Sequence, residues 1–297
     1  MQSIDGITSA HFAAPHPELS RYVTTYYVAE VNSPDGQEVT DLLHPEWGSV
    51  RYLCRGSVRG SAQPDPMVAI APVTLIGHSS RASQIACASM RIASFGLLPL
   101  GWQRFVGLPA SRFADRSADA SETKTRTDFA ALFNAVSTAK GLGEIAAIFD
   151  TALLHTLSQP TKNNEEDEAM IEALHVALLD PEVSSVAEIN GRLDITATQL
   201  ERLSKRVFGF APKLLLRRQR FLRTLALLMR EPQSKWGEIL DPQYYDQAHF
   251  NRDFQRFFGM SPKQYLALDK PIVLAGAIAR MEALGDPLQG LHAPRGK

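Results

Sequence analysis

The sequence predicts a multidomain protein of the α+β class, with a β-rich barrel first, a helical connector next and an all-α domain at the C-terminal end. Short apolar runs broken by Pro, Gly and Asp fill residues 1–120, which is typical of strands joined by turns. Ala and Leu then recur at helical spacing in residues 128–157. Finally, residues 196–213 closely resemble residues 246–263, which indicates a repeated helical unit.

The composition is that of a soluble globular protein. The chain has 297 residues, of which 44% are hydrophobic and 21% charged, enough for two domains that each bury a core. No apolar run approaches the roughly 20 residues that a membrane span needs, and the N-terminus lacks a basic segment followed by an apolar signal core. We therefore expect a cytoplasmic protein with no membrane partner.

The changes in residue pattern along the chain divide it into five segments. Residues 1–120 are expected to form the β-rich domain and residues 121–158 the helical connector. The connector is amphipathic, which fits either a dimer interface or packing on its own barrel. Residues 159–167 are a polar linker, residues 168–270 the helical domain, and residues 271–297 a tail. The apolar part of the tail fits either a helix packed on the protein or a disordered end.

The repeat pairs structurally important residues at a constant offset of 50. The identical pairs are Arg202 with Arg252, Arg206 with Arg256, Phe208-Gly209 with Phe258-Gly259, and Pro212-Lys213 with Pro262-Lys263. Chance does not readily produce agreement at so many positions without a gap. The two segments are therefore predicted to be copies of one unit.

Each copy is predicted to be one helix with an ordered exit. Thr196 and Asp246 are suitable N-caps, because their side-chain oxygens can accept hydrogen bonds from free backbone N–H groups. Gly209 and Gly259 lie where a left-handed residue would end each helix. Apolar residues recur on one face of each helix, which leaves a polar face for solvent or for a partner.

The polar faces carry side chains of the types that bind DNA in other proteins. Amide, hydroxyl and cationic groups are those that bond base edges and phosphates in the major groove. One such face is most simply a solvated surface, but matched faces in two copies favour nucleic-acid recognition. The candidate DNA-contacting residues on these faces are Thr198, Glu201, Arg202 and Lys205 in the first copy, and Gln247, His249, Asn251, Arg252 and Arg256 in the second.

The copies are expected to be joined by a rigid basic helix. Residues 212–230 would be about 28 Å long as a helix, and recognition helices in successive major grooves lie about 34 Å apart. This helix has four arginines that we expect on a basic face: Arg217, also a candidate DNA contact, Arg218, Arg220 and Arg223. Residues 196–268 contain 13 Lys and Arg against 6 Asp and Glu, a local balance of +7. Supporting helices are predicted to begin at residue 185 and at residue 236.

With these features, the C-terminal region resembles the AraC/XylS family of bacterial transcription regulators. Residues 246–250, Arg252, Phe254 and residues 258–262 are close to that family's signature. The resemblance covers about residues 168–268 and implies a DNA-binding domain with two helix-turn-helix units. The base and backbone contacts that it implies fall on Thr198, Glu201 and Arg202 in the first unit, and on Gln247, Ala248, His249 and Arg252 in the second.

Two features depart from the family pattern. Gln243 stands where the family usually has Gly, and Pro242 is expected to end the second supporting helix early. Ser204 occupies the position that Phe254 fills in the other copy, which leaves a smaller contact with the core. We therefore expect the second unit to dock differently or to bind more weakly.

The β-rich domain resembles the cupin-like sensory domain of one subgroup of this family, on residues 75–78, 95–102 and 105–109. The eight histidines include no His-x-His pair, so we expect no metal, no cofactor and no catalytic residue. A ligand would lie in the mouth of the barrel. The candidate ligand-binding residues are Trp47, Arg51, Tyr52, His78, Arg81 and Trp102, although such side chains are more often core or surface residues.

Three functions fit the sequence. The first, which we predict, is a one-component transcription regulator and not an enzyme: a small-molecule effector acts on the N-terminal domain, and the helical domain binds double-stranded promoter DNA. A homodimer and contact with RNA polymerase would accompany this function. The second is an enzyme with a catalytic barrel that the helical domain localises to DNA. The third is a DNA-binding protein without an effector, controlled by a partner protein or by its abundance.

Overall fold

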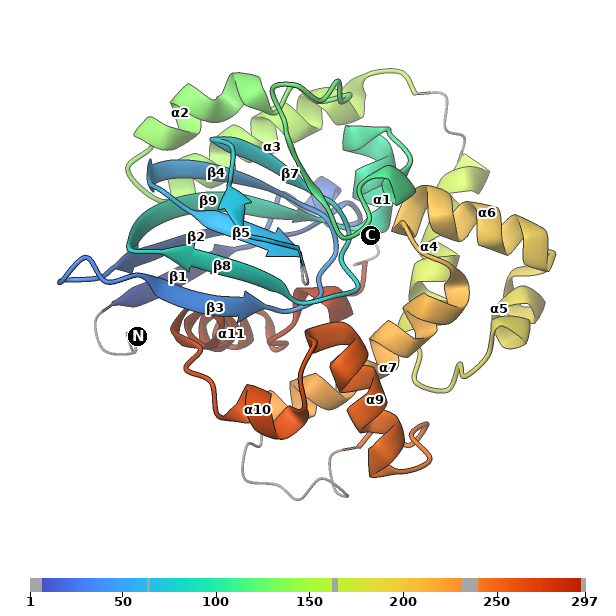
Figure 1. Ribbon diagram of the computed structural model, residues 1–297. Coiled ribbons are helices and arrows are strands. Elements are labelled where there is room, and N and C mark those ends of the chain that lie inside the picture. Colours follow the sequence, from blue (N-terminus) through green and yellow to red (C-terminus); the bar gives the residue numbers. More distant parts are fainter. Residues whose placement is uncertain (1–6, 63–64, 162–164, 231–239, 295–297) are drawn as a thin grey trace.

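The computed structural model describes residues 7–62, 65–161, 165–230 and 240–294. Within these ranges the strands lie before residue 120 and form two antiparallel sheets, and most of the remaining chain is helical (Figure 1). The predicted order of a β-rich domain followed by a helical domain is confirmed. No helix in these ranges is long and apolar enough to span a bilayer.

The larger sheet has six strands in the order β1-β2-β9-β4-β7-β10. Its strands are β1 (Thr8–Ala13), β2 (Val23–Asn32), β4 (Ser49–Gly56), β7 (Val73–Ile76), β9 (Ser89–Leu97) and β10 (Ser117–Asp119). The smaller sheet has the order β3-β8-β5-β6. Its strands are β3 (Val39–Leu43), β5 (Arg59–Ala62), β6 (Val68–Ala69) and β8 (Ser83–Cys87). The sheets pack together through a small apolar cluster that includes Ile85 and Ile92.

The amphipathic connector packs on the larger sheet. It forms α2 (Phe133–Thr138) and α3 (Leu142–Ser158), and the apolar face of α3 is fully buried. The ring centroid of Phe149 lies 5.4 Å from that of Tyr26 and 4.8 Å from that of Phe95. The sequence fits either a dimer interface or packing on the protein's own β domain. The apolar face of this segment packs on the β domain.

Short helical turns join the larger elements. They are η1 (Pro17–Leu19), α1 (Pro99–Gly101), η2 (Trp102–Val106), η3 (Ala110–Arg112), η4 (Ala130–Leu132) and η5 (Gln289–Leu291).

The helical domain contains both copies of the repeat. Its helices are α4 (Glu165–Leu179), α5 (Val186–Leu193), α6 (Ala197–Phe208), α7 (Pro212–Arg230), α9 (Gln247–Phe258) and α10 (Pro262–Leu266). The predicted recognition helices are α6 and α9, and the predicted connecting helix is α7 with the same bounds. The supporting helix predicted from residue 236 falls on residues 231–239, which lie outside the described ranges, and Pro242 lies in a turn.

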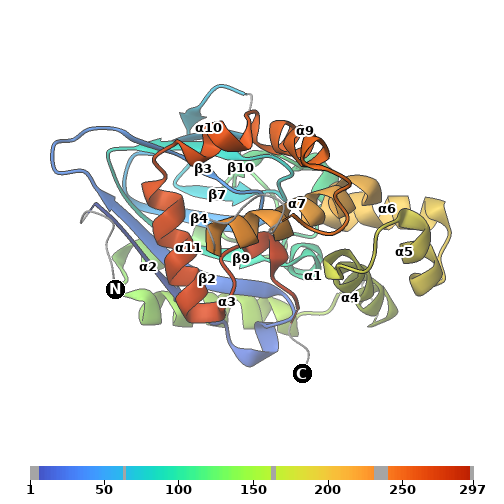
Figure 2. The same ribbon diagram turned by 90° about the horizontal axis from the view of Figure 1, so that it is seen from below.

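The tail returns to the β domain instead of ending near the helical domain. It forms α11 (Pro271–Leu284), which lies along β1 and β3 (Figure 2). The carboxylate of Asp41 in β3 accepts hydrogen bonds from the backbone N–H groups of Ile272 and Val273, at 2.8 and 2.9 Å. This contact satisfies two donors that the first turn of a helix leaves free, and so fixes the start of α11 on the smaller sheet.

The helical domain also packs directly on the β domain. The backbone N–H of Ala82 donates to the carbonyl of Phe257 at 2.7 Å. The indole of Trp47, fully buried, lies 5.8 Å from the ring of Phe208 and 4.3 Å from the guanidinium carbon of Arg218. The ends of both recognition helices therefore contact the β domain.

Candidate nucleic-acid interface and ligand cavity

The first recognition helix, α6, has the caps that its sequence predicts. Thr196 forms a capping box with Gln199: its hydroxyl accepts from the backbone N–H of Gln199 at 3.3 Å, and its own N–H donates to the Gln199 side chain at 2.9 Å. Gly209 ends the helix at φ 84°, where a β-carbon would be strained. Ser204 is fully buried, and its hydroxyl donates to the carbonyl of Phe210 at 2.7 Å, which offsets its small size.

The outward face of α6 is open to solvent. Thr198, Arg202 and Lys205 are exposed. Glu201 is half-buried, and its carboxylate lies 2.8 Å from the ammonium of Lys205, one turn away. An exposed pair of this kind contributes little to stability and can rearrange around a ligand. The predicted DNA contacts of α6 therefore share one accessible face.

The second recognition helix, α9, is built on an aromatic core. Asp246 caps it by accepting from the backbone N–H of His249 at 2.6 Å, and Gly259 ends it at φ 70°. Its buried face consists of Phe250, Phe254, Phe257 and Phe258, together with Asp253. Its exposed candidates are Gln247, Ala248, Asn251, Arg252 and Arg256.

His249 differs from its neighbours on α9. It is half-buried, its Nε2 lies 3.2 Å from Nη2 of Arg220, and its ring stands edge-on to that of Tyr244 at 5.1 Å. Partial burial and the nearby guanidinium lower the pKa of His249 below its usual value, so the imidazole stays neutral near pH 7. If His249 contacts DNA, it does so with a neutral ring that already contacts Arg220 and Tyr244.

The expectation of an open basic face on α7 is wrong. Arg217 and Arg220 both donate to the fully buried carboxylate of Asp253, and Arg223 donates to the buried carboxylate of Asp241 at 2.5 Å. Both carboxylates belong to the second helix-turn-helix unit. Three arginines of α7 therefore form ion pairs that hold this unit against α7. Arg217 remains a predicted DNA contact with its side chain 31% exposed, in competition with its ion pair.

Arg218 is not on a basic face either, because it is fully buried against the β domain. Its guanidinium lies over the Trp47 ring, and one nitrogen donates to the side chain of Gln219 at 3.0 Å. Burial lowers the pKa of Arg218 to about 9. The arginine thus belongs to the contact between domains.

Three histidines, of which His78 and His175 are buried and His44 is half-buried, predict a loss of stability in acid. Burial lowers the pKa of His44, His78 and His175 to about 3, from an ordinary value of about 6.5. Between these values the unfolded chain binds protons that the folded protein excludes, so the free energy of unfolding falls as pH drops from 6.5 toward 3. We expect each histidine to contribute a loss on the order of 1 kcal/mol or less between pH 7.5 and pH 6 in urea denaturation. In His175→Phe the pH dependence should be shallower, and an unchanged slope would contradict this assignment.

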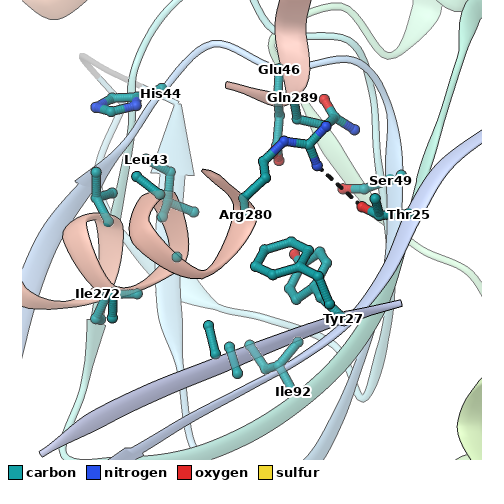
Figure 3. A pocket seen from close by; sticks show the side chains of 18 of the residues that line it. Thr25, Tyr27, Leu43, His44, Glu46, Ser49, Ile92, Ile272, Arg280 and Gln289 are labelled. Carbon is teal, nitrogen blue, oxygen red and sulfur yellow. Dashed lines mark hydrogen bonds between the residues drawn. The ribbon is translucent and has the colours of Figure 1, made fainter. Parts of the chain in front are cut away.

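A cavity of ≈ 160 Å³ lies between the two sheets, and α11 forms one of its walls (Figure 3). One end is apolar, with Leu43, Ile92 and Ile272. The other end is polar, where Arg280 of α11 points toward Thr25 and Ser49. The guanidinium of Arg280 donates to the hydroxyl of Thr25 at 3.2 Å. This is the arrangement of a small-molecule site, an apolar pocket with a few converging polar groups.

Of the six candidate ligand-binding residues, only Arg51 lines this cavity, with its guanidinium paired with the carboxylate of Glu46. Four of the others are fully buried in the core: Trp47, Tyr52, His78 and Trp102. They have structural partners; Nδ1 of His78, for example, accepts from the backbone N–H of Gly48 at 2.7 Å. Arg81 is exposed. The structure therefore does not bring the six together.

No sequence pattern selects the polar residues that do meet in the cavity. Ser49 is an ordinary strand residue, and Arg280 lies in a tail whose packing was open. The run of small residues at positions 275–277, Ala-Gly-Ala, is a signal in the tail, because it leaves one turn of a helix without large side chains.

Comparisons with known proteins agree with this geometry in the C-terminal region. Residues 190–267 match the model of a helix-turn-helix domain family. No curated protein matches the chain. Among solved structures, unsaturated fatty acid bound ToxT from Vibrio cholerae is 12% identical, with 90% of this chain and 97% of that chain covered and a TM-score of 0.44. A cupin superfamily protein from Desulfitobacterium hafniense is 12% identical, with 33% of this chain and 84% of that chain covered and a TM-score of 0.25.

The family match spans the region in which two capped helices expose matched polar faces and are joined by α7. The domain in front of it is β-rich, as the sequence predicts, and consists of two antiparallel sheets. The C-terminal region is therefore a helix-turn-helix domain, and it follows a β domain made of two antiparallel sheets.

Proposed function

We propose that the protein is a one-component transcription regulator, in which α6 and α9 bind promoter DNA and a small-molecule effector binds in the cavity of the β domain. The observation that carries this proposal is the pair of exposed faces on two capped helices within one helix-turn-helix domain. The proposed base and phosphate contacts are Thr198, Glu201, Arg202, Lys205, Arg217, Gln247, Ala248, His249, Asn251, Arg252 and Arg256. Such a protein acts where promoter DNA lies, in the cytoplasm or nucleoid.

Arg202→Ala and Arg252→Ala test the proposed DNA contacts. Both guanidinium groups are exposed at equivalent positions of the two recognition helices. Each variant should weaken specific binding by about 1–3 kcal/mol, roughly 5- to 150-fold, if the residue contacts a base. Fluorescence anisotropy with promoter fragments at fixed salt measures this loss.

Arg59→Ala is the matched control, because it removes the same charge from an exposed ion pair with Glu38 in the β domain. Its affinity for DNA should equal that of the parent protein. Unchanged affinity in both Arg202→Ala and Arg252→Ala would refute the assignment of these helices.

The two recognition helices do not lie parallel in the structure: their axes run in clearly different directions (Figure 1). The relative orientation of the two helices, together with any bend in the DNA, therefore decides whether both enter major grooves at once.

The effector proposal rests on the cavity, which combines apolar walls with converging polar side chains. In this proposal the β domain binds a ligand and has no catalytic role, and stoichiometric metal in the purified protein would instead support a catalytic barrel. A thermal-shift screen that finds no ligand, alongside specific DNA binding, would favour control by a partner protein.

Homodimerisation and contact with RNA polymerase complete the proposal. Sedimentation at micromolar concentration tests homodimerisation.

A further inference from the structure

Helix α11 lines the cavity but does not fill it. Between Ile272 and Arg280, α11 places the small residues Ala275, Gly276 and Ala277 along the cavity wall, and a β-carbon built on Gly276 would meet no atom within 4 Å. On the opposite side of the helix, Leu274 and Ile278 are exposed. Small side chains thus occupy the middle of the wall that α11 forms, where larger ones would have filled the cavity.

The polar end of the cavity presents hydrogen-bond donors. Ser49 is 1% exposed, and its hydroxyl has no hydrogen-bond partner among the described residues. It faces the cavity beside Arg280, which is 3% exposed (Figure 3). Buried hydroxyl groups almost always have a partner, so the position next to Ser49 and Arg280 suits a ligand atom that accepts hydrogen bonds.

The opposite end suits an apolar body. Leu43, Ile92 and Ile272 line it, and these residues come from the smaller sheet, the larger sheet and α11 respectively. A ligand that fills the cavity therefore touches both sheets and α11 at the same time.

The same walls contact the second helix-turn-helix unit. His44 lines the cavity, and its Nε2 lies 2.7 Å from the hydroxyl of Tyr265 in α10, in a hydrogen bond. The Tyr265 ring in turn lies 5.5 Å from that of Phe254 and 5.1 Å from that of Phe258, both in α9. Only residues 267–270 separate α10 from α11. Two contiguous routes thus join the cavity to the second recognition helix.

We propose that α11 is a wall of the effector site, that the ligand has an apolar body and a hydrogen-bond-accepting head group held by Ser49 and Arg280, and that occupancy acts on the second helix-turn-helix unit through Tyr265. This inference rests on the proposed function, because that proposal identifies the bound molecule as an effector. It makes the C-terminal tail part of the sensor.

Calorimetric titration of the full chain with three probes tests the site: 4-butylbenzoate, 4-butylbenzyl alcohol and 4-butylbenzylamine. They share an apolar body, and the protonated amine has donors alone. The acid should bind most tightly, the alcohol roughly tenfold more weakly, and the amine not measurably. Arg280→Gln should weaken binding of the acid roughly tenfold or more.

Gly276→Leu should abolish binding of the acid and the alcohol by filling the cavity, while the helix gains propensity and the chain remains folded by circular dichroism. Ile278→Gln, on the exposed side of α11, should bind both probes like the parent protein. Parent-like binding in Gly276→Leu, binding of the amine as tight as that of the acid, or no binding of any probe by the parent protein would each overturn the proposed site.

Tyr265→Phe tests the coupling, because it keeps the ring and removes the hydroxyl that bonds His44. It should bind the acid like the parent protein, but the change in DNA affinity on adding the acid should fall by at least half. A full change in DNA affinity would overturn the coupling. Loss of specific DNA binding by the parent protein, with binding of the acid intact, would instead refute the proposed function and leave the site standing.

Discussion

Asp253→Ala is expected to lower the free energy of unfolding by about 3–5 kcal/mol, because it removes a buried carboxylate and leaves its partners behind. Asp253 is fully buried and receives hydrogen bonds from Arg220 and from the Tyr244 hydroxyl, both at 3.1 Å, as well as from Arg217. Two guanidinium groups on α7 would lose their shared counter-charge. Urea denaturation at pH 7.5 measures the loss.

Asp253→Asn should cost less, since it preserves the volume and one acceptor. Glu201→Ala is the matched control, because it breaks an exposed pair with Lys205, whose side chains are 45% and 55% exposed. That change should cost no more than about 0.5 kcal/mol. Equal losses for Asp253→Ala and Glu201→Ala would contradict the view that the arginines of α7 hold the second unit in place.

Trp47→Ala is expected to cost about 3–5 kcal/mol and to weaken the contact between domains. The indole lies between two domains: its ring contacts His78 of the β domain and His175, Phe208 and Arg218 of the helical domain. Its removal leaves a cavity there and takes the aromatic face from a buried cation. Denaturation followed by circular dichroism should then show two transitions where the parent protein shows one.

Trp102→Ala provides the control, since Trp102 is equally buried but packs on Phe113 and donates to the carbonyl of Leu108, both in the β domain. It should cost a similar amount of free energy and destabilise the β domain first. If both variants unfold in one transition with the same denaturant dependence, Trp47 has no special part in joining the domains.

The recognition helices were predictable because their determinants are local. A capping residue, a glycine that can adopt positive φ and an apolar stripe all lie within about 14 residues, and the repeat shows each of them twice. Thr196, Asp246, Gly209 and Gly259 accordingly have the predicted conformations. The exposure of Arg202 and Arg252 follows from the same periodicity.

The cavity and the ion pairs of the α7 arginines were not predictable, because the residues that form them are far apart in the sequence. Arg280 bonds Thr25 across 255 positions, and Arg217 bonds Asp253 across 36. Periodicity within a segment indicates which residues face outward, but not which partner covers them. The candidate ligand-binding residues therefore included buried aromatic residues such as Trp47, and the expected basic face of α7 included arginines that are paired with carboxylates.

Hydroxyl-radical footprinting of the protein on its promoter DNA tests the central claim most directly. Two recognition helices in one domain predict two protected segments on one face of the duplex, about 10 base pairs apart. Arg202→Ala should remove one segment and Arg252→Ala the other. A single protected segment that only one of the two variants removes, or no protection at all, would contradict the claim that both α6 and α9 bind DNA.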